Sequence, residues 1–232
     1  MKKLLLGILA FSASGTVLAQ APNTLTAKEK KDGWVLLFDG TTTTGWHTYN
    51  QTTVGESWKV TDGALTLTPG AEGRGDLTTD GEYENYELSL EWKIAEGGNS
   101  GIIFDVHEDA KFGASYLTGI EMQVLDDVKA EDNKQPNHLA GSLYDIIAPA
   151  RAANAAGQWN TVKIRQKDGK LTFWMNGSKV VNVGLWDDNW KKLVAGSKFK
   201  SFPDFATYKK GRVALQDHGA TVSYRNIKVK QL

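Results

Sequence analysis

The amino-acid sequence predicts an all-β protein, a jelly-roll β-sandwich of two antiparallel sheets. Short segments alternate apolar and polar residues, and Gly, Asn and Asp turns separate these segments. No segment keeps a helical period over three turns, and residues 186–197 are expected to hold one or two turns at most. The length of 232 residues fits a single all-β domain.

The clearest predicted strand covers residues 86–94, where apolar side chains alternate with Glu, Ser and Lys. A period of two buries one face of a strand and exposes the other. The domain begins at the apolar run 34–38. Similar patterns predict further strands at residues 101–106, 119–125, 159–167, 171–175, 179–183, 211–217 and 222–229.

Tight turns connect three of these strands into a meander, because Asp-Gly at 168–169 and Asn-Gly at 176–177 suit the positive φ angles of hairpin turns. Segments 211–217 and 222–229 are expected to form a terminal hairpin. The apolar phase slips within residues 224–227, which predicts a β-bulge there. The polar loop 126–141 is much longer than the other connections, and long loops often carry function.

Composition excludes several classes of function. Lys and Arg (27) balance Asp and Glu (27), so the chain has no basic surface suited to nucleic acid. Cysteine is absent, which excludes disulfides, zinc-thiolate sites and thiol nucleophiles. The chain lacks the glycine-rich nucleotide-binding motifs and the nucleophile elbow of hydrolases. The eight tryptophans are consistent with sugar stacking.

Residues 1–19 are predicted to be a signal peptide, so the protein is expected to be exported to the periplasm or secreted. Lys2 and Lys3 precede an apolar run, and Ala19 ends the small-residue pattern of a cleavage site. The apolar run is shorter than the ~20 residues that span a bilayer, so no membrane span is expected. Residues 20–31 are interpreted as a polar leader, and residues 32–232 as the single jelly-roll domain.

Strand 119–125 carries the first candidates for chemistry. Glu121 and Gln123 are two residues apart and therefore lie on the same face. That face either lines a concave groove or is solvated, and the pattern alone leaves both readings open. Asn99, at the start of another strand, either closes a turn or binds sugar hydroxyls.

Histidines and loop tryptophans supply further candidates. His138 lies in the long polar loop and His218 in the turn after residue 217, and imidazoles accept or donate protons near neutral pH. No signature fixes a metal, and the acidic clusters at 108–109 and 126–127 are interpreted as solvated loops. The tryptophans in loop-like stretches are the candidate stacking platforms: Trp46, Trp186 and Trp190.

A series of short motifs, in order along residues 31–232, resembles one family. These motifs are Leu37-Phe38-Asp39-Gly40 with Gly45-Trp46, Trp58-Lys59-Val60 with Asp62-Gly63-Ala64-Leu65, Asn99-Ser100-Gly101-Ile102, Glu121-Met122-Gln123-Val124-Leu125-Asp126, Leu143-Tyr144-Asp145, Gly157-Gln158-Trp159-Asn160, Asn176-Gly177, Leu215-Gln216-Asp217-His218-Gly219 and Tyr224-Arg225-Asn226-Ile227. Their number and order resemble the 3-keto-disaccharide hydrolase family, which includes 3-keto-glucoside 1,2-lyases and 3-keto-2-hydroxy-glucal hydratases.

The resemblance implies a concanavalin-like jelly roll that acts on glycosides or oligosaccharides oxidised at C3. It implies that Glu121, Gln123, Asp126, His138 and His218 lie near the concave groove, and Glu121, His138 and His218 are the catalytic candidates. The substrate-binding candidates are Asn99, Gln123, Tyr144, Asp145 and Trp46. No cofactor is required by the sequence, but a divalent metal is compatible with it, and its candidate ligands are Glu121, Asp126 and His138.

The chemistry this implies is an elimination followed by a hydration. A C3 ketone acidifies the C2 proton, so a base can form an enolate that expels the aglycone from C1, and water then adds. A conventional glycoside hydrolase and a carbohydrate-binding module are the alternatives. A conventional hydrolase needs two carboxyl groups, and the position two after Glu121 carries the amide of Gln123.

Overall fold

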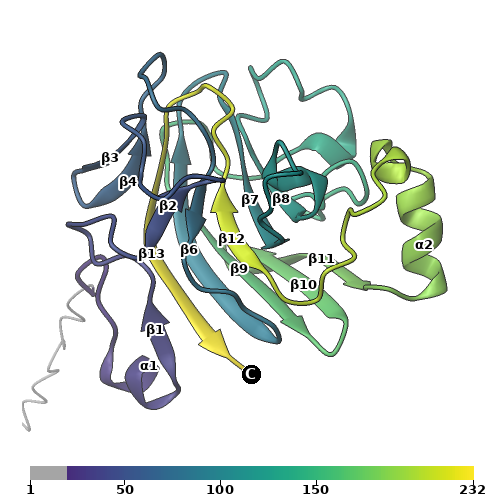
Figure 1. The fold of residues 1–232 in the computed structure, drawn as a ribbon, viewed down its shortest axis with the longest axis horizontal. Coiled ribbons are helices and arrows are strands. Elements are labelled where there is room, and N and C mark those ends of the chain that lie inside the picture. Colours follow the sequence, from purple (N-terminus) through teal and green to yellow (C-terminus); the bar gives the residue numbers. More distant parts are fainter. Residues whose placement is uncertain (1–19) are drawn as a thin grey trace, which may run out of the picture.

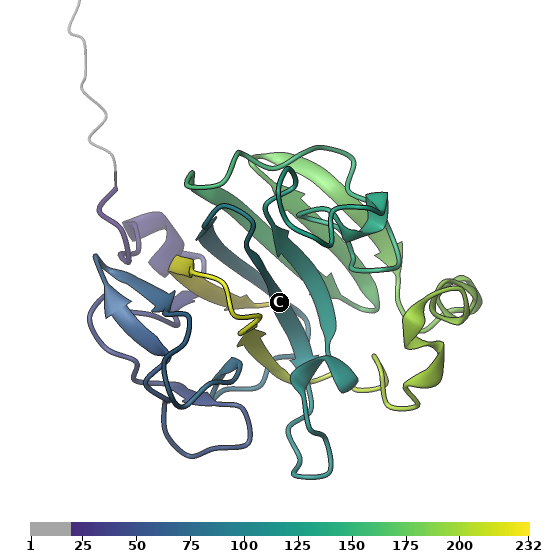
Figure 2. The same ribbon diagram turned by 90° about the horizontal axis from the view of Figure 1, so that it is seen from above.

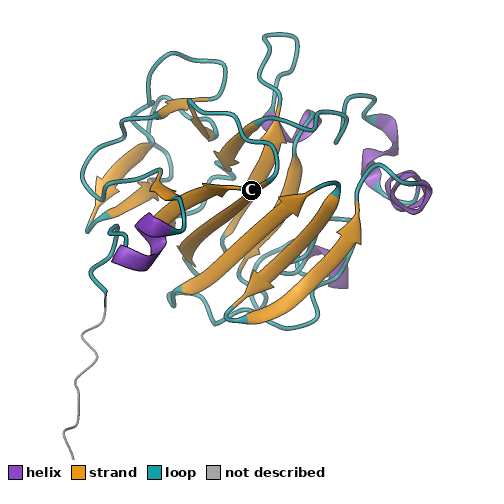
Figure 3. Ribbon diagram, turned by 90° about the horizontal axis from the view of Figure 1, so that it is seen from below, coloured by secondary structure: helices purple, strands orange, loops and turns teal. Residues whose placement is uncertain are grey.

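Two antiparallel β-sheets pack face to face in the computed structural model, which describes residues 20–232 (Figure 1). The predicted signal peptide, residues 1–19, lies outside the described residues. Strands dominate the molecule and its short helices lie at the periphery (Figure 3). The predicted all-β sandwich of two antiparallel sheets is therefore confirmed.

The larger sheet has eight strands, in the order β11-β10-β9-β6-β13-β4-β3, and β1 also pairs with β13. In chain order these strands are β1 (Trp34–Leu36), β3 (Trp58–Thr61), β4 (Ala64–Leu67), β6 (Tyr86–Ile94), β9 (Asn160–Lys167), β10 (Lys170–Met175), β11 (Ser178–Gly184) and β13 (Val222–Gln231). The predicted meander is confirmed as β9-β10-β11, and β13 shifts register between Arg225 and Lys228, where the sequence predicts a bulge.

The smaller sheet has five strands in the order β2-β5-β12-β7-β8. These strands are β2 (Trp46–Thr48), β5 (Leu77–Thr79), β7 (Asn99–Val106), β8 (Ile120–Leu125) and β12 (Arg212–Leu215). Strand β8 is at the edge of this sheet, so the long loop that follows it is free to fold back along that edge.

The predicted terminal hairpin is wrong, because β12 and β13 belong to different sheets. Val213 and Leu215 face the core from the smaller sheet, and Val222 and Tyr224 face it from the larger one. Alternation in sequence indicates which side chains are buried but does not identify the neighbouring strand. Residues 216–221 therefore cross from one sheet to the other at one end of the sandwich.

The core lies between the two sheets. The apolar side chains of β6, from Tyr86 to Ile94, are almost completely buried on one face. They belong to the same cluster as Ile102 and Phe104 of β7. Phe104 meets Phe173 of the larger sheet edge-to-face at 5.8 Å, a favourable aromatic geometry. This packing fixes the smaller sheet as a rigid support for the side chains on its outer face.

Helices and short 3-10 turns surround the sandwich. They are α1 (Ala27–Lys31), η1 (Ser115–Leu117), η2 (Pro136–His138), α2 (Asp188–Ala195) and η3 (Lys198–Ser201). Helix α2 stands at one side of the sandwich (Figure 2) and lies within the segment expected to hold one or two turns. Between residues 20 and 232, no helix has the length and apolar character needed to cross a membrane.

The segment interpreted as a polar leader, residues 20–31, is attached to the sandwich. The Asn23 backbone N–H donates to Asn226 Oδ1 (2.5 Å), and Asn23 Oδ1 accepts from the Asn226 backbone N–H (2.8 Å). Asn23 Nδ2 also donates to the Gly63 carbonyl oxygen (2.8 Å). Asn23 therefore joins this segment to β13 and to the turn between β3 and β4.

Candidate functional site

The long loop after β8 covers the outer face of that strand. Ile120, Met122 and Val124 point into the core, so Glu121 and Gln123 lie on the opposite face. The loop folds back along the strand: the Gly141 N–H donates to the Gln123 carbonyl (2.8 Å), and the Tyr144 N–H donates to the Glu121 carbonyl (3.1 Å). Glu121 is consequently only 5% exposed and Gln123 only 1%.

The carboxyl group of Glu121 lies over Gly101 on the neighbouring strand β7. A Cβ atom at position 101 would come within 2.1 Å of Glu121 Oε1, so the missing side chain makes room for the carboxyl group. No residue between 20 and 232 donates a hydrogen bond to it. Burial raises the pKa of Glu121 to about 8; Lys198 opposes this shift, while Asp76 and Asp132 add to it.

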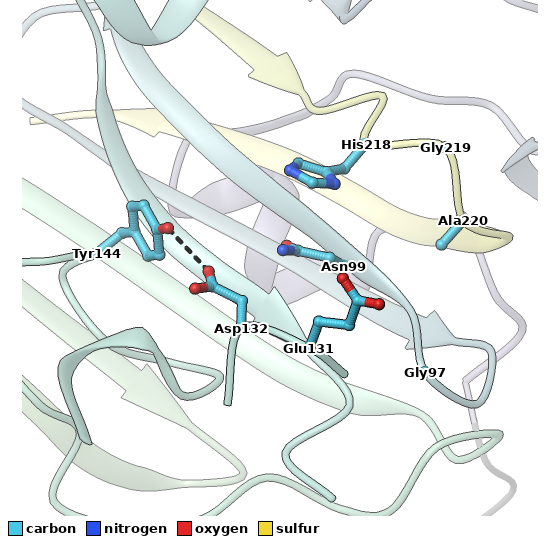
Figure 4. Close-up of a pocket in the computed structure, with 8 residues that line it drawn as sticks. All are labelled: Gly97, Asn99, Glu131, Asp132, Tyr144, His218, Gly219 and Ala220. Carbon is cyan, nitrogen blue, oxygen red and sulfur yellow. Dashed lines mark hydrogen bonds between the residues drawn. The ribbon is translucent and has the colours of Figure 1, made fainter. Parts of the chain in front are cut away.

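A pocket of about 580 Å³ lies between the β12–β13 connection and the long loop. Its lining residues come from the β6–β7 turn, strand β7, the long loop and the β12–β13 connection: Gly97, Asn99, Glu131, Asp132, Tyr144, His218, Gly219 and Ala220 (Figure 4). Three predicted site residues, Asn99, Tyr144 and His218, therefore line one pocket. Glu121 does not line the pocket, but its carbonyl accepts from the Tyr144 N–H, and the charge of Asp132, another lining residue, raises its pKa.

His138 holds the long loop together. Its Nδ1 lies 2.8 Å from Asp132 Oδ1 and its Nε2 lies 2.9 Å from Asp145 Oδ1. The Tyr144 hydroxyl donates to Asp132 Oδ2 at 2.8 Å, and the Lys198 backbone N–H donates to Asp145 Oδ2 at 2.6 Å. Both ring nitrogens of His138 are occupied, so the structure does not support the predicted catalytic or metal-binding role, and Asp145 is likewise occupied by loop contacts.

The predicted metal ligands do not assemble. Asp126 uses both carboxylate oxygens for the loop, accepting from the backbone N–H groups of Gly97 (2.8 Å) and Val128 (3.1 Å). Burial opposes ionisation of Asp126, but these N–H groups outweigh it and lower its pKa. Across residues 20–232, no three His, Cys, Asp or Glu side chains form a group suited to a metal ion. The set Glu121, Asp126 and His138 thus does not fit a metal.

Four further predicted binding or stacking residues do not line the pocket. Trp46 is 5% exposed and packs in the core, where its indole N–H donates to the Leu37 carbonyl (2.6 Å), so it cannot stack on a sugar. Trp190 is buried as well, and Trp186 lies beside α2 and does not line the pocket. Gln123 is buried under the loop, and its Oε1 accepts from the Val124 N–H (3.1 Å).

His218 is exposed at the pocket, and its position depends on the residue before it. The Asp217 carboxylate accepts hydrogen bonds from Arg74 Nε (3.1 Å) and from the backbone N–H groups of Gly75 (3.1 Å) and Gly219 (3.0 Å). No hydrogen bond in the described part of the chain engages the His218 ring. Its nitrogens are therefore available to a ligand in the pocket.

Sequence reasoning missed three charged residues that contribute to this site. Asp132 and Lys198 flank Tyr144, and the half-buried Asp76 accepts a hydrogen bond from the Asp217 N–H (2.9 Å) beside His218. The unusual length of loop 126–141 is the signal that could have indicated Asp132. Lys198 lies in a segment without any motif, so only the fold reveals it.

Comparisons with known proteins agree on one family. The 3-keto-alpha-glucoside-1,2-lyase-like domain matches residues 33–230. A 3-keto-disaccharide hydrolase of Bacteroides thetaiotaomicron is 32% identical over 252 residues, which cover 96% of this chain and 87% of that protein. A proposed glycosyl hydrolase of Parabacteroides distasonis has a crystal structure similar to this one, with a TM-score of 0.85 and 32% identity over 91% of this chain and all of that one.

A more distant neighbour shows the fold alone. A Bacillus subtilis protein with a galectin-like fold has a TM-score of 0.51 at 14% identity, over 91% of this chain and 94% of that one. Structural similarity at such low sequence identity places the two-sheet sandwich among galectin-like folds. It gives no information about activity.

Proposed function

Because this chain belongs to the 3-keto-alpha-glucoside-1,2-lyase-like domain family, we propose that it cleaves glycosides oxidised at C3 and releases their aglycone. The observation that carries this proposal is the buried Glu121 carboxyl group beside the pocket. A carboxyl group with a raised pKa is a stronger base when ionised than an ordinary glutamate, as removal of a C2 proton requires. The backbone contact of Glu121 with Tyr144 and its electrostatic interaction with Asp132, both of which line the pocket, support a role in catalysis.

In the proposed reaction, Glu121 removes the proton from C2, and the electron pair of that bond forms an enolate with its charge on the C3 oxygen. The enolate then re-forms the C3 carbonyl, a C1–C2 double bond forms, and the C1–O bond to the aglycone breaks. His218 protonates the departing oxygen, because its ring is free at the pocket. The product is the 3-keto-2-hydroxy-glucal.

Hydration completes the proposed sequence. Water adds across the double bond, so the hydroxyl group arrives at C1 and a proton arrives at C2, giving the 3-keto sugar. Asn99 and Tyr144 supply polar groups for the sugar hydroxyls. Burial and the hydrogen bond to Asp132 raise the pKa of Tyr144, so its hydroxyl stays protonated.

The decisive experiment compares one glucoside with its 3-keto derivative, each incubated with purified protein in D2O, with and without a chelator. We expect the 3-keto form to lose its aglycone and to gain deuterium at C2, while the intact glucoside remains uncleaved. Without the ketone, the C2 proton is too weakly acidic for a side-chain base. The chelator arm tests independently whether a divalent metal assists.

Cleavage of the intact glucoside without exchange at C2 would favour a conventional glycoside hydrolase. The structure offers such an enzyme a second carboxylate near Glu121, since Asp132 lines the pocket. If both substrates survived while still binding, the protein would instead be a carbohydrate-binding module. A folded Glu121→Gln variant serves as the matched control, because it keeps the shape of the side chain and loses the base.

A further inference from the structure

Lys198 is held in a fixed position beside the pocket. Its backbone N–H donates to Asp145 Oδ2 (2.6 Å), and the next residue, Phe199, is buried and stacks on Phe205 with ring centroids 3.9 Å apart. From this anchored backbone the side chain reaches Tyr144, and its Nζ lies 4.1 Å from the centre of the Tyr144 ring. Tyr144 lines the pocket, so the ammonium group lies against a residue of the pocket wall, and Lys198 itself is not among the lining residues.

The charges around Lys198 are mostly negative. Asp132 and Glu131 line the pocket, and the buried Glu121 and half-buried Asp76 are near it. None of the carboxylates in residues 20–232 forms an ion pair with Lys198 Nζ. Its charge does reach Glu121, where it favours the ionised carboxylate. A lone ammonium group in an acidic site is therefore available to a ligand.

The proposed reaction creates a charge that these acids would repel. Removal of the C2 proton places a negative charge on the C3 oxygen, beside Glu121 and Asp132. Positioned cationic or hydrogen-bond donors are the usual means of stabilising such an oxyanion. Among the described side chains that contact Tyr144, Lys198 is the cation.

We propose that Lys198 is a catalytic residue, whose ammonium group donates a hydrogen bond to the C3 oxygen as the enolate forms. This inference rests on the proposed function. The proton from C2 goes to Glu121, the charge goes to the C3 oxygen, and Lys198 stabilises that charge without transferring its own proton. When the aglycone leaves, the C3 carbonyl re-forms and the charge departs with the glycosidic oxygen, which His218 protonates.

The test compares Lys198→Met, Lys198→Arg and Lys200→Met. Lys200 is exposed on the same 3-10 turn, so Lys200→Met removes an equal charge without removing the contact with Tyr144. The measurements are the rate of C2 deuterium exchange in the 3-keto glycoside, kcat and KM for its cleavage, and the pH midpoint of the exchange rate. Circular dichroism and the thermal midpoint of each variant verify the fold.

For Lys198→Met we expect exchange and kcat to fall about 10²–10³-fold, as when an oxyanion donor is removed elsewhere. The pH midpoint should rise, because the charge that favours the Glu121 carboxylate is gone. Lys198→Arg should recover part of the exchange rate, and Lys200→Met should match the wild type in all measurements.

Three results would contradict one or the other of the two proposals. If the wild type cleaves the 3-keto glycoside and Lys198→Met exchanges C2 as fast as Lys200→Met, then Lys198 is not catalytic and the proposed function stands. An increase in KM alone, with exchange at saturation unchanged, would likewise overturn the proposal, since it indicates binding only. If the wild type itself neither cleaves nor exchanges the 3-keto glycoside, the proposed function fails instead.

Discussion

Glu121 is a carboxyl group that is buried without a hydrogen-bond donor, and burial of that kind strongly disfavours its charge. Burial raises the pKa of Glu121 to about 8, so its neutral carboxylic acid form predominates at neutral pH. Alternation along residues 119–125 predicts that Glu121 and Gln123 share a face, and the structure agrees. The same pattern could not indicate which of the two would adjoin the pocket, because that depends on Gly101 and on the returning loop.

Stability and activity should respond to pH in opposite directions through Glu121. The folded protein holds this proton more tightly than the unfolded chain, where a glutamate titrates near 4.5. The free energy of unfolding should therefore fall as pH rises from about 4.5 to 8, by an amount on the order of a few kcal/mol. As the proposed base, Glu121 must be ionised to remove the C2 proton, so the rate of C2 deuterium exchange, which does not use the proposed acid His218, should rise through pH 8.

Urea unfolding at pH 5 and pH 9, together with a pH profile of the C2 exchange rate, measures both effects. Glu121→Gln should lose most of the activity and also this part of the pH dependence of stability. A wild-type rate of C2 exchange that decreases through pH 8 would assign Glu121 as an acid rather than a base. Unchanged activity in the folded Gln variant would remove it from the mechanism.

Gly101→Ala should displace the Glu121 carboxyl group. The new Cβ would lie 2.1 Å from Oε1 and 2.8 Å from the carboxyl carbon, so the side chain has to move. We expect a loss of about 1–3 kcal/mol in stability from overpacking. A shift of 1 Å in a catalytic group costs up to ~10²-fold in rate. Gly113→Ala is the control, because a methyl group at position 113 would have no neighbour within 4 Å. Equal activity of Gly101→Ala and Gly113→Ala would contradict this geometry.

Among the elements, the loop after β8 has the largest effect on the site. Its length indicates function in the sequence, yet its shape depends on contacts that no local pattern predicts. It pairs with the edge of β8, Asp126 fixes its start, and His138 links Asp132 to Asp145. A histidine and two aspartates separated along a loop look equally suited to catalysis, to metal binding or to this structural role, so the sequence could not separate these readings.

His138→Ala should mainly raise KM, whereas His218→Ala should mainly lower kcat. Loss of His138 leaves Asp132 and Asp145 without their shared partner, so we expect the loop to loosen and KM to rise, with kcat changed less than ~10-fold. Loss of His218 removes the proposed acid and should lower kcat by about 10²–10⁴-fold. Steady-state kinetics on a 3-keto glycoside separates the two, and a drop in kcat for His138→Ala as large as that for His218→Ala would restore His138 as a catalytic candidate.

For the molecule as a whole, local alternation predicts most strands but not their partners. Strand β6 and the meander β9-β10-β11 follow the expected residues closely, because tight turns force neighbouring strands to pair. The expected hairpin of β12 and β13 fails because residues 216–221 change sheets. That crossing brings His218 to the pocket end, so the feature that local reasoning missed is also the feature that assembles the site.

We predict that signal-peptide cleavage makes Gln20 the N-terminus, and the contacts of residues 20–23 lead us to expect that the fold stays intact without residues 1–19. Gln20 Nε2 donates to the Thr24 carbonyl (2.6 Å), and Asn23 joins the segment to Asn226 and Gly63. Protein starting at Gln20 should therefore be fully stable.

Deletion of residues 20–23, or Asn23→Ala, leaves partly buried polar groups unpaired and should lower the free energy of unfolding by about 1–3 kcal/mol. N-terminal sequencing of exported protein and thermal unfolding of these variants measure both points. An intact Met1 on exported protein would contradict the cleavage, and equal stability of the deletion would contradict the attachment.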